Sequence, residues 1–259
     1  MSSRTSRTLI RASVFAGALV LAQAALAGRL IMNHDEWTLT DYGFNAAPAS
    51  TTAFAHNLAA YMNADGGPCS LLVYSDNFGL TGASLKSALT GAGCSVTYST
   101  GAFDLGTLSG YDGVLLAGHQ FNYDAPTLTS YLNNGHSAYI AAGTASIANE
   151  DSAWDPFTHQ YGLDFGPSYN TVRGVIPISN SAPLFAGVTQ LYFNNGNSVG
   201  NYGVNPDAQI ILSLGNDGLL GVYSDPPRIV GTQAIPEPAS LTLLGIGLAA
   251  LGLRRRKTR

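Results

Sequence analysis

Short apolar runs alternate with amphipathic segments along residues 50–142. Residues 50–62 place Phe54, Leu58 and Tyr61 on one helical face, and the glycine pair that follows predicts the end of this helix. Further helices are predicted over residues 83–90 and after Asp124, and short strands over residues 70–74, 95–98, 114–117 and 137–142. Because helical segments alternate with the strands, we expect a mostly parallel sheet that helices cover on both faces.

The second half of the chain is richer in strand patterns. Strands are predicted over residues 172–178, 191–194, 210–214 and 219–223, with a hairpin turn at Asn216-Asp217-Gly218. Residues 224–235 contain a proline pair and are predicted to form a linker. The predicted fold class is α/β: a mostly parallel sheet sandwiched by helices over residues 28–223, with a β-rich second half and a hydrophobic helix at the C-terminus.

The N-terminus has the pattern of a targeting segment. Three arginines precede an apolar stretch over residues 12–26, and Ala25-Leu26-Ala27 fits an A-x-A cleavage site. Residues 1–27 are therefore predicted to be a Sec-type signal peptide, which makes the Sec translocon and signal peptidase expected partners. The alternative, a cytoplasmic amphipathic helix, is disfavoured because no acidic residue precedes Asp35.

The C-terminus combines three features in a fixed order. Pro236-Glu237-Pro238 is followed by uncharged residues 239–253 and then by a basic cluster, which comprises Arg254, Arg255, Arg256 and Lys257. A helix over residues 239–253 would be about 22 Å long, which is short of the ~30 Å hydrocarbon core. We therefore expect this segment to be a short, temporary transmembrane anchor. The basic cluster predicts a stop-transfer signal on the cytoplasmic side. The alternative is an ordinary C-terminal anchor.

This tail, residues 236–259, resembles the PEP-CTERM sorting signal of exported proteins from Gram-negative bacteria. The resemblance implies an inner-membrane-anchored precursor, cleavage near the Pro-Glu-Pro motif by exosortase, and a mature form at the cell surface or outside the cell. Members of that family often come from bacteria that make extracellular polysaccharide, so polysaccharide is an expected partner.

Removal of both ends changes the charge of the protein. The whole chain has a net charge of −4, but residues 28–235 contain four basic and fifteen acidic side chains and so carry −11. Such an acidic surface repels phosphate backbones, so nucleic acid is not an expected partner. The five histidines show no paired metal spacing such as H-x-x-x-H, and neither a metal nor a cofactor is predicted.

The two cysteines, Cys69 and Cys94, each precede a predicted strand. If those strands are parallel neighbours, both cysteines lie at the same edge of the sheet. Because the compartment outside the inner membrane is oxidising, we expect a disulfide, worth about 3 kcal/mol on the chain-entropy model. The alternative is two buried free thiols.

The middle of the chain also resembles the class I glutamine amidotransferase-like fold, a flavodoxin-like α/β sandwich, over roughly residues 68–223. The resemblance rests on residues 111–118, 131–135, 138–144 and 182–188. In that family a cysteine follows the fourth strand and is paired with a downstream histidine. Here that turn is Ala141-Ala142-Gly143-Thr144, and no histidine occurs after His159, so amidotransfer is not expected and no catalytic residue is assigned.

Ligands of open α/β sheets bind at the carboxyl ends of the strands. The polar residues expected there are Ser75, Asp76, Asn77, His119, Gln120 and Thr144. The favoured interpretation is that these side chains cap loops. The alternative is a hydrolase of extracellular glycans or esters, with Thr144 as nucleophile and His119 as base, or with a bound metal.

Two further groups have both a functional and an ordinary interpretation. Residues 33–37, Asn-His-Asp-Glu-Trp, together with Asp41 could supply oxygen ligands to Ca²⁺, but a solvated edge or an N-terminal strand is favoured. Four tyrosines could form a sugar-binding face, although tyrosine is also a common residue of strands and loops: Tyr161, Tyr169, Tyr192 and Tyr202. The sequence therefore predicts a non-catalytic binding or structural module of the cell surface.

Overall fold

The computed structural model describes residues 28–63, 66–119, 122–144 and 149–224. The predicted signal peptide, Gln120, most of the linker, and the sorting tail with its span over residues 239–253 lie outside the described residues. Within the described ranges, no helix is both long and apolar enough to cross a membrane.

A seven-stranded sheet forms the centre of the molecule, with the strand order β10-β11-β1-β5-β4-β2-β3. The strands are β1 (Arg29–Asn33), β2 (Ser70–Val73), β3 (Ser95–Tyr98), β4 (Gly113–Ala117), β5 (Ser137–Ala141), β10 (Ala208–Leu214) and β11 (Asp217–Ser224). Neighbours from β1 to β3 pair in parallel, and β11 is antiparallel to both β1 and β10. The predicted mostly parallel α/β sheet is confirmed.

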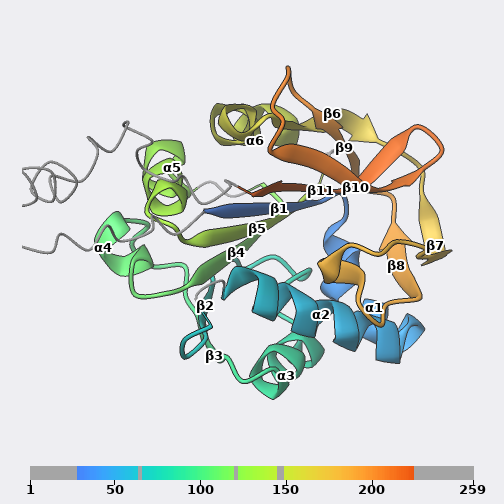
Figure 1. The fold of residues 1–259 in the computed structure, drawn as a ribbon, viewed down its shortest axis with the longest axis horizontal. Coiled ribbons are helices and arrows are strands. Elements are labelled where there is room, and N and C mark those ends of the chain that lie inside the picture. The colour runs from blue at the N-terminus through green and yellow to red at the C-terminus, as the bar shows by residue number, and fades with distance from the viewer. Residues whose placement is uncertain (1–27, 64–65, 120–121, 145–148, 225–259) are drawn as a thin grey trace, which may run out of the picture.

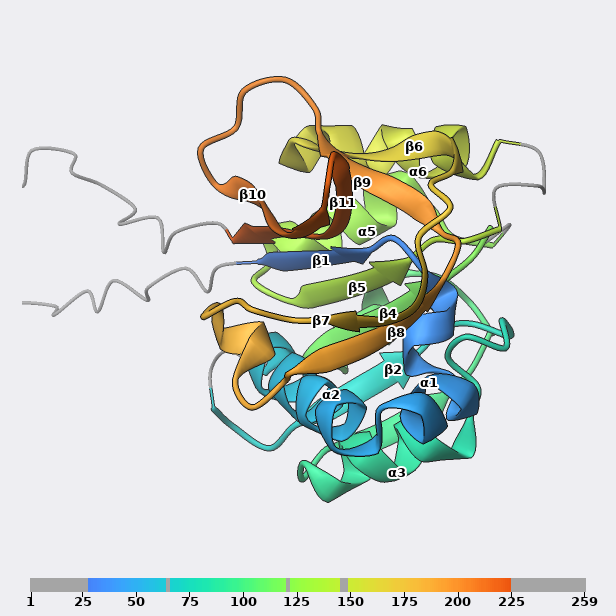
Figure 2. The same ribbon diagram turned by 90° about the vertical axis from the view of Figure 1, so that its right-hand side faces the viewer.

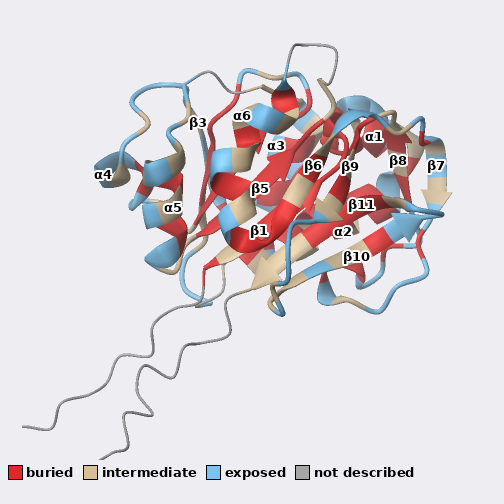
Figure 3. Cartoon of the chain, turned by 90° about the horizontal axis from the view of Figure 1, so that it is seen from above, coloured by how far each residue is buried: buried red, intermediate tan, exposed pale blue. Residues whose placement is uncertain are grey.

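Helices cover both faces of this sheet (Figure 2). One side carries α1 (Asp41–Ala46), α2 (Pro48–Met62) and α3 (Ala83–Gly91), and the other carries α4 (Leu105–Leu108), α5 (Ala125–Asn133) and α6 (Glu150–Thr158). Alternate strand residues point to opposite faces, so Leu30 packs into one core and Ile31 into the other. The central strands are buried on both faces, as Figure 3 shows, which explains their nearly continuous apolar sequences.

Two antiparallel ribbons from the second half of the chain flank the sheet (Figure 1). One pairs β6 (Leu163–Tyr169) with β9 (Asn197–Asn201), and the other pairs β7 (Arg173–Pro177) with β8 (Gln190–Asn194). Strands β7, β8, β10 and β11 fall where the apolar runs predict them, whereas β6 and β9 are not predicted. Short 3₁₀ helices occupy residues 36–39, 159–161 and 183–185.

The turn between β10 and β11 lies earlier than predicted. Leu214 pairs with Asp217, so the two-residue loop is Gly215-Asn216, and Gly215 has a φ of +61°. Asp217 and Gly218 belong to β11 instead of the turn. Glycine adopts a positive φ without a steric penalty, which places the turn at Gly215.

The N-terminal polar segment is not a solvated edge. Strand β1 lies between β5 and β11, and Asn33, His34 and Asp35 are each fully buried. The prediction of a solvated edge is therefore wrong, whereas the alternative N-terminal strand is correct up to Asn33. Burial follows from long-range pairing of β1 with β5, more than a hundred residues away in the chain, which local polarity does not reveal.

A disulfide joins Cys69 to Cys94, as the sequence predicts. Ser70 and Ser95 are directly paired in the parallel ladder of β2 and β3, so the two preceding cysteines meet at the same sheet edge. The amide of Ser95 donates to the carbonyl oxygen of Cys69 at 2.8 Å, which holds the two segments together. The Cα atoms of the cysteines are 4.4 Å apart.

Candidate functional site

The carboxyl edge of the sheet collects polar side chains from several loops. Strands β1, β2, β4 and β5 are parallel and end at this edge (Figure 2). Strand β2 lies between β3 and β4, and α3 and α4 pack on opposite faces, so the winding direction changes between β2 and β4. Such a switch point is the usual ligand position in open α/β sheets.

Glu36 lies at the centre of this edge, three residues after β1. Its side chain is only 4% exposed, and its Oε2 accepts a hydrogen bond from Nδ2 of Asn77 at 2.6 Å. Burial raises the pKa of Glu36 to about 7, with a smaller contribution from the negative charges of Glu150 and Asp35. In the described part of the chain, no lysine or arginine forms an ion pair with it. Glu36 therefore gains or loses a proton near neutral pH.

The two residues before Glu36 are buried and have perturbed pKa values. Oδ1 of Asp35 accepts from the amide of Trp37 at 3.0 Å, Oδ2 accepts from the amide of Asn194, and burial raises the pKa of Asp35 to about 6. Burial lowers the pKa of His34 to about 3, so its ring is neutral. Nδ1 of His34 is 3.0 Å from Nδ2 of Asn170, an arrangement in which the neutral ring nitrogen accepts.

Glu150, the first residue of α6, brings a second buried glutamate to the same edge. Its side chain is 1% exposed, and its Oε2 accepts from the amides of Gly143 at 3.2 Å and Thr144 at 2.8 Å. Its Oε1 is buried and has no hydrogen-bond partner among the described residues. Burial raises the pKa of Glu150. Sequence analysis missed this residue because α6 was not predicted, although Trp154 and Phe157 have helical spacing.

Glycine at position 118 allows these groups to approach one another. Gly118 has a φ of +66°, and a Cβ there would lie 2.6 Å from Nδ2 of Asn77 and 3.4 Å from Oε2 of Glu36. A side chain at this position would displace the amide that hydrogen-bonds Glu36. The close packing of Asn77 and Glu36 around Gly118 therefore requires glycine at this position.

The structure brings together only some of the residues that sequence analysis selected. Asn77 joins Glu36, and Ser75 is buried, with its Oγ accepting from the amide of Asn77 at 3.0 Å. Thr144 contributes its amide to Glu150, His119 is half-buried, and Asp76 is exposed. The calcium interpretation, which the sequence disfavoured, gains no support: Asp35, Glu36 and Asp41 do not form a metal-sized cluster among the described residues, and exposed Asp41 accepts from the amide of Ser84 at 2.8 Å.

Four aromatic side chains form a row beside Glu36, which we call the aromatic strip. Trp37 is central: its ring lies 4.9 Å from Phe78 and 6.2 Å from Tyr42, and Tyr42 lies 4.7 Å from Tyr192. Tyr42 is 56% exposed and Phe78 is 47% exposed. Exposed apolar rings that cluster in this way mark interaction surfaces on soluble proteins.

The four tyrosines suggested as a sugar-binding face do not all lie on a surface. Tyr161 is buried, packs against Phe157 and Tyr223, and its hydroxyl donates to the carbonyl oxygen of Thr129 at 3.3 Å. Tyr192 belongs to the aromatic strip, whereas Tyr202 stacks on His159. The exposed aromatic surface at the carboxyl edge therefore has a different composition from the predicted set.

Comparison with known proteins identifies only the tail. Residues 234–257 match the PEP-CTERM protein-sorting motif. This motif implies an exported protein that is anchored in the membrane before exosortase processes it. No curated protein and no solved structure matches the chain, so the resemblance to the amidotransferase-like fold is not supported.

Proposed function

We propose that the chain is a non-catalytic polysaccharide-binding module of the bacterial cell surface, sorted and cleaved by exosortase, and that it binds through the aromatic strip. The sorting motif supports the export pathway. The observation that carries the binding proposal is the aromatic strip beside the polar carboxyl edge.

The position of the chain ends favours an outward orientation of this edge. Arg29 pairs with Ser224, so both described ends of the domain emerge at the amino edge of the parallel strands. The carboxyl edge lies at the opposite end of β1, about 17 Å away for a strand of five residues. The linker to the tail therefore leaves the domain at the edge opposite the aromatic strip, so the attachment point does not cover the strip.

The chemistry of the aromatic strip suits a sugar chain. A pyranose ring has an apolar face of C–H groups and a rim of hydroxyls, and an aromatic ring next to hydrogen-bonding groups complements both. Here exposed Phe78 directly follows exposed Asp76 and half-buried Asn77. With a net charge of −11 over residues 28–235, neutral sugars are better ligands than acidic ones.

Replacement of two exposed rings tests this proposal. We expect the double variant Tyr42→Ala and Phe78→Ala to bind a glycan array, and the extracellular polysaccharide of the producing bacterium, at least about tenfold more weakly, because each ring supplies about 1 kcal/mol of contact. Tyr169→Ala removes a tyrosine that is 37% exposed and lies outside the strip, and it serves as the control. Unchanged binding by the double variant, or no glycan bound by the wild type, would refute the proposal.

A hydrolase is the second candidate function, and the observation in its favour is Glu36. A carboxyl group whose pKa is about 7 can act as a general acid or base at neutral pH. The sequence suggests His119 with Thr144, or a bound metal, as the reacting groups. Turnover of glycan or ester substrates that Glu36→Gln and His119→Ala both abolish would support this candidate over simple binding.

A further inference from the structure

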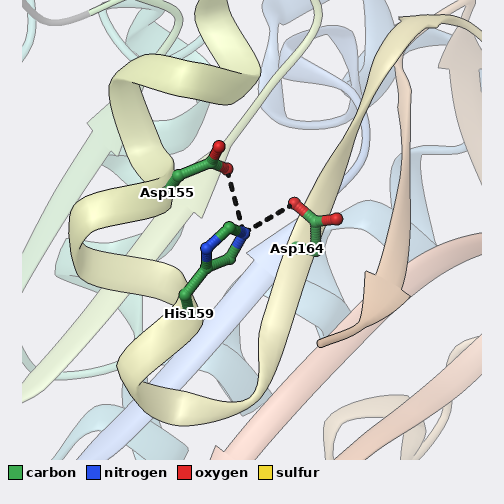
Figure 4. A group of neighbouring side chains, drawn as sticks. All are labelled: Asp155, His159 and Asp164. Atoms are coloured by element: carbon green, nitrogen blue, oxygen red, sulfur yellow. Dashed lines mark hydrogen bonds and ion pairs between the residues drawn. The ribbon is translucent and has the colours of Figure 1, made fainter. Parts of the chain in front are cut away.

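A histidine lies between two aspartates at the junction of α6 and β6, as Figure 4 shows. Nε2 of His159 is 3.2 Å from Oδ1 of Asp155 and 3.3 Å from Oδ1 of Asp164. All three side chains are partly exposed, from 26% to 39%, so solvent ions can reach them. Asp155 and His159 are four residues apart, at the end of α6 and the start of the 3₁₀ helix that follows it, and Asp164 comes from β6.

A single proton on Nε2 of His159 cannot form a full hydrogen bond to both aspartates. A ring nitrogen carries at most one hydrogen, but two carboxylate oxygens approach the same Nε2. In the described residues, no lysine or arginine pairs with either aspartate.

The distances match the edges of a metal coordination polyhedron. Ligand nitrogen and oxygen atoms about 2.1 Å from a divalent ion lie roughly 3.0–3.4 Å from one another in octahedral or tetrahedral geometry. The three candidate ligand atoms all lie within 4.8 Å of one another, and the two distances from Nε2 of His159 to the carboxylate oxygens fall in the 3.0–3.4 Å interval. One ion could therefore bind all three atoms with little rearrangement.

The orientation of the imidazole is held independently of the aspartates. The His159 ring stacks face to face on Tyr202, with centroids 3.5 Å apart and planes 1° from parallel. This stack fixes the plane of the imidazole ring and limits its rotation. A ligand whose ring is already oriented loses less conformational entropy when an ion binds.

We propose that Asp155, His159 and Asp164 form a divalent transition-metal site, and that Zn²⁺ is the ion that fits best. Imidazole together with carboxylates favours Zn²⁺ over Ca²⁺ and Mg²⁺, which prefer oxygen ligands alone. Three protein ligands leave a position for water. The ion fastens the end of α6 to β6, whereas the start of α6 carries Glu150 at the carboxyl edge.

Calorimetric titration of the metal-free, full-length protein with ZnCl₂, purified without a histidine tag, tests the site. We expect one Zn²⁺ per chain, and binding at least about tenfold weaker in His159→Gln and in the nearly isosteric Asp164→Asn, because loss of a ligand costs at least as much as loss of a supporting group. His56→Gln removes a histidine from α2 and should bind as the wild type does. Circular dichroism verifies that each variant folds.

A second measurement does not depend on the variants. Binding to the folded state alone raises the melting temperature, so Zn²⁺ should stabilise the wild type and His56→Gln, and Ca²⁺ at the same concentration should not. No Zn²⁺ binding by the wild type, or equal binding by His159→Gln and the wild type, would overturn the proposal.

Discussion

A protein in which glutamine replaces Glu36 is expected to be more stable than the wild type at pH 8 and about equally stable at pH 4. Glutamine has nearly the shape of a protonated glutamate, and its carbonyl oxygen can still accept from Nδ2 of Asn77. The substitution therefore removes the titration of Glu36 and leaves most of its packing in place.

The sign follows from the raised pKa of Glu36. The pKa is about 7 in the folded protein and 4.5 in the reference state, so the contribution of this group to stability is complete below pH 4.5. Between these values the folded protein binds a proton that the unfolded chain releases, and stability falls as the pH rises. The full difference is about 3 kcal/mol, from 1.36 kcal/mol for each pKa unit.

Asp35 and His34 also titrate, so the effect of Glu36 must be obtained from the difference in stability between the wild type and Glu36→Gln at each pH. The raised pKa of Asp35 contributes in the same direction as Glu36, whereas the pKa of His34, lowered to about 3, contributes stability that is lost as the pH falls below 6.5. Urea unfolding of both proteins from pH 4 to pH 8 separates Glu36 from these groups. Asp104→Asn, which changes an exposed helix cap, should leave this part of the profile unchanged. Parallel profiles for the wild type and Glu36→Gln would contradict the account.

Loss of the disulfide is expected to lower the free energy of unfolding by about 3 kcal/mol. Cys69 and Cys94 are 25 residues apart, and a cross-link of this span removes conformational entropy from the unfolded chain. Cys94 is buried and Cys69 packs against the same core, so alanine at both positions preserves the apolar environment.

Urea unfolding of the double variant and of the reduced wild type measures this loss. Both should unfold at a lower urea concentration than the oxidised wild type, and reduction should add two hydrogens to the mass of the wild type. The reductant should not change the urea midpoint of the double variant. This comparison controls for effects of the reductant other than cleavage of the disulfide. A midpoint that reduction leaves unaltered would show that the cross-link does not stabilise the fold.

Sequence patterns were sufficient where local signals and final structure agree. Strands β2, β3, β4 and β5 are short apolar runs bounded by turns, and their helical connections dictate parallel pairing. The disulfide followed from the same pattern, because each cysteine directly precedes a strand of one parallel pair. The start of α5 was predictable because Asp124 accepts from the amide of Thr127 at its first turn.

The candidate site was only partly predictable because burial there depends on distant segments. The polarity of residues 33–36 indicates exposure, but pairing of β1 with β5 and β11 buries them. Glu150 lies in a helix that contains Pro156, which disguised its helical pattern. Asn77 was selected correctly as a loop residue, but its partner Glu36 lies 41 residues away. The Asp155–His159 spacing was visible in the sequence, whereas the approach of Asp164 required the fold.

Mass spectrometry of the protein purified from the outer face of the producing bacterium tests the central claim most directly. The claim is that the signal peptide exports the chain, and that the tail anchors it until exosortase cleaves near Pro236-Glu237-Pro238. The account predicts an N-terminus at Gly28 and a C-terminus at or close to Pro236-Glu237-Pro238, without residues 239–259. A mature chain that still ends at Arg259, or a chain confined to the cytoplasm with Met1 in place, would contradict it.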